Sequence, residues 1–259
     1  VSTSTLSTLV TALPTRTSDS YGTIRAKNID EITSSANAKY WNVTDKMLIA
    51  RYTANKSGVV PTFNEGYQYE INETESDGIY TVELYSNTDF TSCSFNGKSN
   101  LLTVEYLKVT SSVISMSYMF YYCSQLTKLN VSNWDTSSVL DISNMFRNCS
   151  QLTQLDLSNW GTSKVITMSN MFRNCSQLTQ LDVSNWDTSN VTNMSNMFDN
   201  CSQLTQLDLS NWNIGQVVSM TNMFYSCSSL NKVTVTNVST STLSTLVNVL
   251  PTRTSDSYG

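Results

Sequence analysis

The residues best suited to chemistry in this sequence are its cysteines, because the chain contains six cysteines and no histidine. Without histidine, a Ser-His or Cys-His pair for nucleophilic catalysis is impossible here, and the commonest metal ligand is missing. The sequence also lacks a nucleophile motif and a Gly-rich phosphate loop. We therefore predict a protein that is not an enzyme and that uses no cofactor and no metal.

Five of the cysteines, from Cys123 to Cys227, recur at intervals of 26 residues. Equivalent positions of stacked repeats lie close enough for disulfides, which are common in extracellular proteins. Equivalent side chains of a stack point in parallel, however, so we favour buried free thiols that pack as small apolar groups. The predicted structural ladder is Cys93, Cys123, Cys149, Cys175, Cys201 and Cys227.

The cysteines mark the repeat that organises the chain, because the segment 168–193 recurs almost unchanged along residues 116–235. In this copy Met168, Phe172 and Cys175 are spaced for one face of a short helix, and the apolar residues that follow alternate as in a strand. One copy alone is too small to fold, so the copies must stack around a continuous core. We predict an α/β leucine-rich-repeat solenoid with a short strand and a short helix per repeat.

The chain as a whole divides into four predicted parts. Residues 1–45 read as a helix–strand–helix connector, 46–89 as a small antiparallel β cap, and 90–237 as the solenoid, with a divergent first repeat and five regular copies. Residues 238–259 repeat residues 1–22 with two substitutions. They predict a capping helix and the start of a next tandem module, or else a duplicated capping helix.

Three local patterns add detail. The sequence Phe90-Thr-Ser-Cys93-Ser matches the Phe-x-x-Cys-Ser of the regular copies and places the divergent first repeat there. Asp77-Gly78 predicts the turn of a hairpin. Asp135 and Asp187, each followed by Thr-Ser, are expected to cap the first turn of a helix.

The outward positions of the predicted strands are the best candidates for ligand contact. Three aspartates would stack on neighbouring strands, and at about 5 Å in water each pair repels by roughly 0.8 kcal/mol, a cost that a cation or a basic partner relieves. A solvated polar ladder is the alternative. The ligand-facing candidates are Lys128, Gln154, Asp156, Gln180, Asp182, Gln206 and Asp208.

A second set of candidates is aromatic. Trp160, Trp186 and Trp212 follow the strands of successive repeats. Stacked indoles could simply close the corner of each repeat, or some could be exposed enough to bind sugars.

Composition limits the partners. Charged residues are 14% of the chain and the net charge is −5, so there is no basic surface for nucleic acid. No apolar run approaches the ~20 residues of a spanning helix, which argues against membrane insertion. The N-terminal residues do not have a signal-peptide layout, so any targeting signal or anchor is expected outside this chain.

The segment Met171-Phe-Arg-Asn-Cys-Ser-Gln-Leu-Thr-Gln-Leu-Asp-Val resembles the BspA-type (Treponema pallidum-type) leucine-rich repeats. It is most similar to the Met-Phe-x-x-Cys-Ser subclass of bacterial surface proteins and prophage tail-associated proteins, and the likeness covers roughly residues 90–235. The resemblance implies an extracellular adhesion or recognition module on a cell surface or virion. Trp134 and its equivalents depart from the usual pattern, which leaves the horseshoe curvature in doubt.

Taken together, these observations predict a non-enzymatic module of a longer, tandemly repeated surface or phage tail-fibre-like protein. Its expected partners are a host-cell surface protein or glycan, and neighbouring modules or a head-to-tail homo-oligomer. The alternative is a purely structural filament or spacer without a specific ligand.

Overall fold

The structure is a computed structural model that describes residues 46–236. The predicted connector at 1–45 and the predicted capping helix at 238–259 lie outside these residues.

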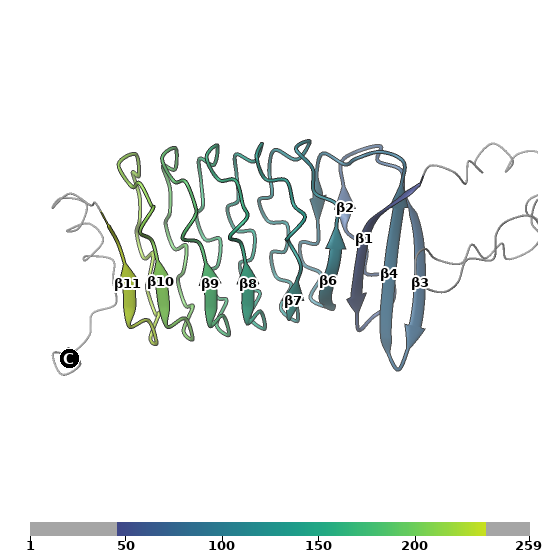
Figure 1. Cartoon of the computed structure of the whole chain (residues 1–259). Coiled ribbons are helices and arrows are strands. Elements are labelled where there is room, and N and C mark those ends of the chain that lie inside the picture. The colour runs from purple at the N-terminus through teal and green to yellow at the C-terminus, as the bar shows by residue number, and fades with distance from the viewer. Residues whose placement is uncertain (1–45, 237–259) are drawn as a thin grey trace, which may run out of the picture. The chain divides into compact units, whose positions relative to one another are not determined.

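A sheet of five strands begins the described region, in the order β3-β4-β1-β6-β7 (Figure 1). Its first four strands are antiparallel, and β3 and β4 are joined at Asp77-Gly78. Strand β7 then pairs parallel to β6, so the sheet leads directly into the repeats. The strands are β1 (Met47–Ala54), β3 (Glu70–Ser76), β4 (Ile79–Ser86), β6 (Leu101–Leu107) and β7 (Lys128–Leu129). A small antiparallel pair, β2 (Thr62–Phe63) with β5 (Cys93–Ser94), lies beside this sheet.

The repeats form a stack of coils, each contributing one short strand on the same side (Figure 1). These strands are β8 (Gln154–Asp156), β9 (Gln180–Asp182), β10 (Gln206–Asp208) and β11 (Lys232–Thr234). Strand β8 pairs parallel with β9, and β10 with β11, and the pairs join equivalent residues, as in Gln154 with Gln180. A second parallel ladder of single bridges joins the coils elsewhere, from Ser115–Asp141 to Asn193–Ser219.

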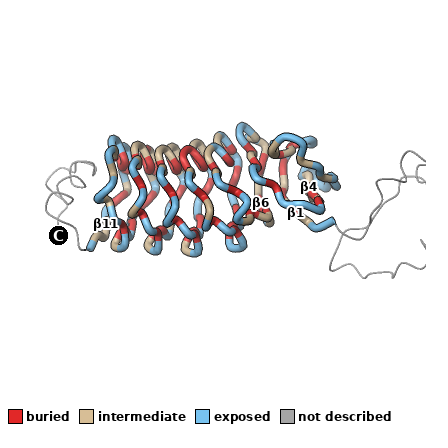
Figure 2. Tube along the Cα trace, turned by 90° about the horizontal axis from the view of Figure 1, so that it is seen from above, coloured by how far each residue is buried: buried red, intermediate tan, exposed pale blue. Residues whose placement is uncertain are grey.

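Buried residues recur in every coil along the stack (Figure 2). The phenylalanine rings from Phe95 to Phe224 stack with centroids 5.5–5.7 Å apart. The indoles from Trp134 to Trp212 stack at 5.8–6.2 Å. Offset stacking at such distances stabilises beyond area burial alone, so the core is continuous along the stack.

The predicted α/β solenoid is wrong, because residues 46–236 contain strands and turns but no helix. Within each coil two residues four apart adopt left-handed backbone, such as Asn170 (φ 56°) and Asn174 (φ 63°). A right-handed helix cannot continue through such a residue. Successive four-residue turns result, with Met171 N donating to Met168 O and Cys175 N to Phe172 O. These turns place apolar residues on one side of the coil, and the sequence spacing of those residues is the same as on one face of a helix.

From Met168 to Asn174 on this turn side, and at the equivalent residues of the other regular coils, the backbone amides that bond between coils donate in one sense. The alternate amides of Met168, Asn170, Phe172 and Asn174 each donate to a carbonyl of the next coil, at 2.8–2.9 Å. Every pair of consecutive regular coils repeats the pattern. Each coil therefore dictates the backbone of its neighbour.

The position of the divergent first coil also differs from the prediction. Phe95, rather than Phe90, stacks on Phe120 at 5.5 Å, and its carbonyl accepts the thiol hydrogen bond of Cys123. Gly97 (φ 72°) takes the second left-handed position. Cys93 is buried but belongs to β5, so it is not a member of the thiol ladder. The Phe-x-x-Cys match at Phe90 was a coincidence of sequence.

Candidate recognition face

The outward residues of the coil strands form two exposed rows on one side of the stack. Strand β8 shows the pattern, because Leu155 is buried and its neighbours Gln154 and Asp156 are exposed. Parallel pairing in register places Gln154 beside Gln180 and Asp156 beside Asp182 on β8 and β9. The exposed residues of these rows are Lys128, Gln154, Asp156, Gln180, Asp182, Gln206 and Asp208.

The aspartates of this face have a structural role that the sequence reasoning missed. Asp156 Oδ1 accepts the backbone N–H of Ser158 at 3.0 Å and its hydroxyl at 2.6 Å. Asp182 makes the same pair of bonds, and Asp208 accepts the amide of Ser210. These are Asx turns that end the strands, and the signal was the Asp-x-Ser spacing itself.

These hydrogen bonds favour the charged form of Asp156 and Asp208. The Ser158 hydroxyl and amide lower the pKa of Asp156, and those of Ser210 lower the pKa of Asp208. In Asp156 and Asp182 the hydrogen bonds from the serines engage Oδ1, which leaves Oδ2 to meet a partner.

The glutamine row is more available than the aspartate row. The side chains of Gln154, Gln180 and Gln206 are exposed and make no hydrogen bond within the described residues. Each amide offers two donors and an acceptor. The face therefore presents unoccupied amides in register, flanked by carboxylates.

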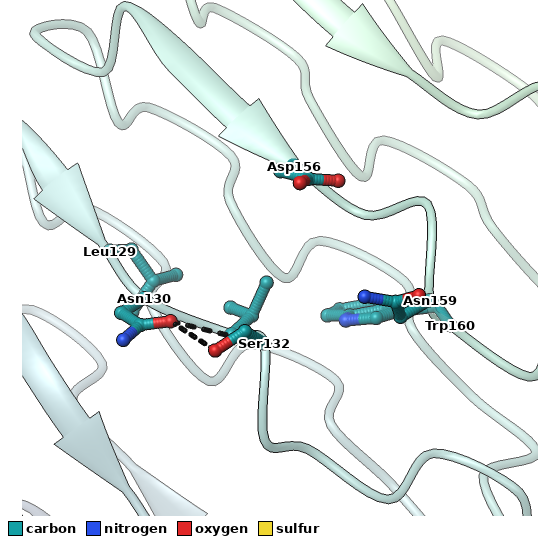
Figure 3. Close-up of a pocket in the computed structure, with 7 residues that line it drawn as sticks. Leu129, Asn130, Ser132, Asp156, Asn159 and Trp160 are labelled. Atoms are coloured by element: carbon teal, nitrogen blue, oxygen red, sulfur yellow. Dashed lines mark hydrogen bonds between the residues drawn. The ribbon is translucent and has the colours of Figure 1, made fainter.

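A small hollow opens where β7 and β8 end (Figure 3). It is lined by Asn130, Asp156, Asn159 and Trp160 among others, and its volume is about 110 Å³. Asn130 Oδ1 is already occupied by Ser132. Typical ligand pockets hold roughly 300–1,000 Å³, so the hollow can take one small polar group of a ligand and recognition has to extend along the surface.

The tryptophans do not offer an aromatic contact surface, which corrects one prediction. Trp160, Trp186 and Trp212 are 4%, 0% and 7% exposed. Their rings stack on one another, and the indole nitrogens of Trp186 and Trp212 donate to backbone carbonyls of the preceding coil. The indoles close the corner of each coil, so sugar binding cannot rest on them.

The regular cysteines form a ladder of unbridged, buried thiols. Each donates to the carbonyl of the ladder phenylalanine one coil back, as Cys175 does to Phe146 O at 3.0 Å. Burial raises the pKa of Cys175 to about 12. Such thiols are neither nucleophiles nor ligands near neutral pH.

Asp135 and Asp187 bond the amides of Ser137 and Ser189, as a cap would. They stabilise a turn rather than a helix, because no helix follows. In residues 46–236 no group of three metal-ligating side chains comes together. The same region contains no helix with the length and apolarity needed to cross a bilayer.

Two overlapping segments of the chain, residues 88–181 and 153–251, match the family model described as "Mycoplasma protein of unknown function, DUF285". Together they cover more than half of the 259 residues. No curated protein and no solved structure matches the chain.

Proposed function

The chain belongs to the DUF285 family, whose repeats are BspA-like, and we propose that it is a non-enzymatic recognition module that binds through its strand face. The observation that carries the proposal is the glutamine row, whose exposed amides have no partner within the described residues. These amides make no hydrogen bond within the described residues, so they can bind a ligand that carries matching donors and acceptors.

The proposed ligand is a surface protein or glycan of a host cell. The same pair of side chains recurs on β8, β9 and β10, so a repetitive ligand such as a polysaccharide can be bound by several coils together. Linked weak sites raise overall affinity without new contacts. Repetition of near-identical coils then serves binding as well as folding.

The proposed setting is extracellular, on a bacterial surface or a phage tail-fibre-like assembly. Residues 238–259 repeat residues 1–22 almost completely, which suggests tandem modules, and head-to-tail association of modules is part of the proposal. The resemblance to the Met-Phe-x-x-Cys-Ser subclass supports the same setting.

A structural spacer is the competing function. The observation in its favour is the uninterrupted ladder of backbone and ring contacts along the stack, which provides length and stiffness with no ligand.

Matched alanine variants distinguish the two functions. Gln154, Gln180 and Gln206 would be replaced together, and the control would replace Gln151, Gln177 and Gln203, which are also exposed but lie outside the row. Each protein would be displayed multivalently and screened on bacterial cells, cell-wall glycans and matrix proteins. Loss of wild-type binding in the row variant alone supports recognition through this face. No binding by the wild type favours the spacer, and equal losses in both variants refute the assignment to the row.

A further inference from the structure

Three tyrosines cluster on the turn side of the first regular coil, where the next coil carries Asn, Arg and Asn. The Tyr121 ring packs edge-on against both others, with centroids 5.2 Å from Tyr118 and 4.6 Å from Tyr122. Tyr118 is 44% exposed and Tyr122 49%. An aromatic surface of three rings therefore faces solvent outside the strand rows.

The backbone at this cluster is strained. Tyr118 and Tyr122 both have φ 59°, in the left-handed region, which is a genuine outlier for a bulky residue. The stack forces it, because their amides donate to the carbonyls of Ser143 and Arg147. The next three coils place asparagine at both positions, and asparagine tolerates this backbone. The fold requires the left-handed backbone but not a tyrosine there, and such strained residues are typical of functional sites.

A cation without a direct ion pair lies beside the rings. The Arg147 guanidinium sits 5.6 Å from the centroid of the Tyr121 ring. Its Nη1 group donates a hydrogen bond to the neutral Asn144 Oδ1 at 3.3 Å. By contrast, the equivalent Arg173 forms an ion pair with Asp199 at 3.0 Å. Within the described part of the chain Arg147 forms no direct ion pair, and the carboxylate of Asp199, which pairs with Arg173, acts on it only through longer-range charge attraction.

Tyrosine in place of asparagine at position 122 also interrupts a ladder of hydrogen-bonded asparagine side chains. Asn200 donates to Asn174 and Asn174 donates to Asn148, at 3.2 and 2.6 Å. The next acceptor position holds Tyr122, and Asn148 Nδ2 is left buried without a partner. Tyr122 therefore strains its own backbone and leaves the Asn148 side chain without a hydrogen bond.

We propose that Tyr118, Tyr121, Tyr122 and Arg147 form a binding site for an acidic pyranose, a sugar ring that carries a carboxylate or a sulfate. The apolar face of a pyranose packs on aromatic rings whose hydroxyls meet its polar edge. The planar guanidinium suits a bidentate bond to a carboxylate or sulfate. Because the protein as a whole is acidic, selection of an anion depends on this local cation. The site is independent of the strand face.

The test uses the 259-residue chain and three glycans on one polymer: sialyllactose, sulfated lactose and neutral lactose. We expect at least one acidic polymer to bind at least tenfold more tightly than the neutral one. Tyr118→Asn with Tyr122→Asn, and separately Arg147→Gln, should each weaken that binding at least tenfold. Both tyrosine changes restore residues used by the neighbouring coils, so the fold is retained, and thermal unfolding verifies this. The control is Tyr225→Asn, which removes another exposed tyrosine without adding a charge and leaves binding unchanged.

Three outcomes would overturn the site: no binding of either acidic polymer, equal binding of neutral lactose, or unchanged binding in the folded tyrosine and arginine variants. Binding to the carboxylate but not the sulfate polymer, or the reverse, identifies the anion. The triple glutamine variant of the strand row should keep this binding, so failure of one site leaves the other untouched.

Discussion

Single left-handed residues decide the shape of each coil. Asn170 shows how, because its amide bonds the next coil while its φ of 56° turns the chain out of any helix. Glycine adopts such backbone freely, whereas alanine carries a steric penalty of roughly 1–2 kcal/mol. The asparagines at these positions are therefore conformational determinants.

Asn170→Ala should lower the free energy of unfolding by about 1 kcal/mol, because alanine resists the left-handed backbone. Asn170→Gly is the matched control and should change it by only a few tenths. Urea denaturation measures both. Equal losses in the two variants would show that the asparagine side chain, rather than the backbone, matters.

The buried thiols predict alkaline sensitivity. An unfolded cysteine titrates near 8.5, whereas burial raises the pKa of Cys175 and Cys227 to about 12. The folded state thus keeps its protons where the unfolded state loses them. Stability from these groups is complete below about pH 8.5 and falls progressively as pH rises toward 12.

Iodoacetamide labelling checks the state of the thiols directly. At pH 8 the folded protein should leave the five ladder thiols unlabelled, and all six cysteines should react in denaturant without reductant. A bridged ladder would instead label in denaturant only after reduction.

At the scale of elements, the end of each coil strand depends on one Asx turn. Asp156→Asn keeps an oxygen acceptor for Ser158 and should hold the thermal midpoint within about 1 °C of wild type. Asp156→Ala removes the acceptor and should lower it measurably, since a hydrogen bond contributes about 1 kcal/mol. If both variants melt alike, the turn does not stabilise the strand.

The hydrogen bonds from Ser158 to Asp156 make the stability of the fold fall at low pH, whereas the buried thiols make it fall at high pH. The pKa of Asp156 is lowered in the folded state, so its contribution is complete above the unfolded value near 3.9 and is lost as pH falls through the folded value. In Asp156→Asn this part of the acid dependence should vanish.

The strands of the repeats could be predicted from the sequence, whereas the turns could not. The repeat interval and the alternation around Leu155 correctly indicated stacked strands with Gln154 and Asp156 outward. The prediction of a helix was wrong because helices and consecutive four-residue turns give apolar residues such as Met168, Phe172 and Cys175 the same spacing. Only backbone torsion separates them.

The candidate site was predictable to a similar extent. Outward positions follow from strand alternation, which needs no tertiary information. Burial of Trp186 could not be read from one sequence, because an indole at a corner can point inward or outward. The tyrosine cluster was visible as a departure of Tyr118 and Tyr122 from the repeat, but its strain required the structure.

At the scale of the molecule, the unbroken interval of the coils predicts that one whole coil is dispensable. Deleting residues 168–193 removes one full repeat and joins equivalent positions, so the protein should fold with a similar circular dichroism spectrum per residue and a modestly lower thermal midpoint. Deleting 168–189 is the control, since it shifts every later ladder and should abolish cooperative unfolding. Equal behaviour of the two deletions would contradict the ladder register.

The one-way hydrogen bonds on the turn side give the stack an electrical direction. Peptide dipoles that point alike add, as they do in a helix, whereas those of ordinary strands largely cancel. Here the amides point toward the later coil, so the positive pole lies at the last coil. There the amides of Met220, Asn222, Phe224 and Ser226 have no acceptor within the described residues. An added coil must present carbonyl oxygens to this end, which allows modules to extend the stack in only one orientation.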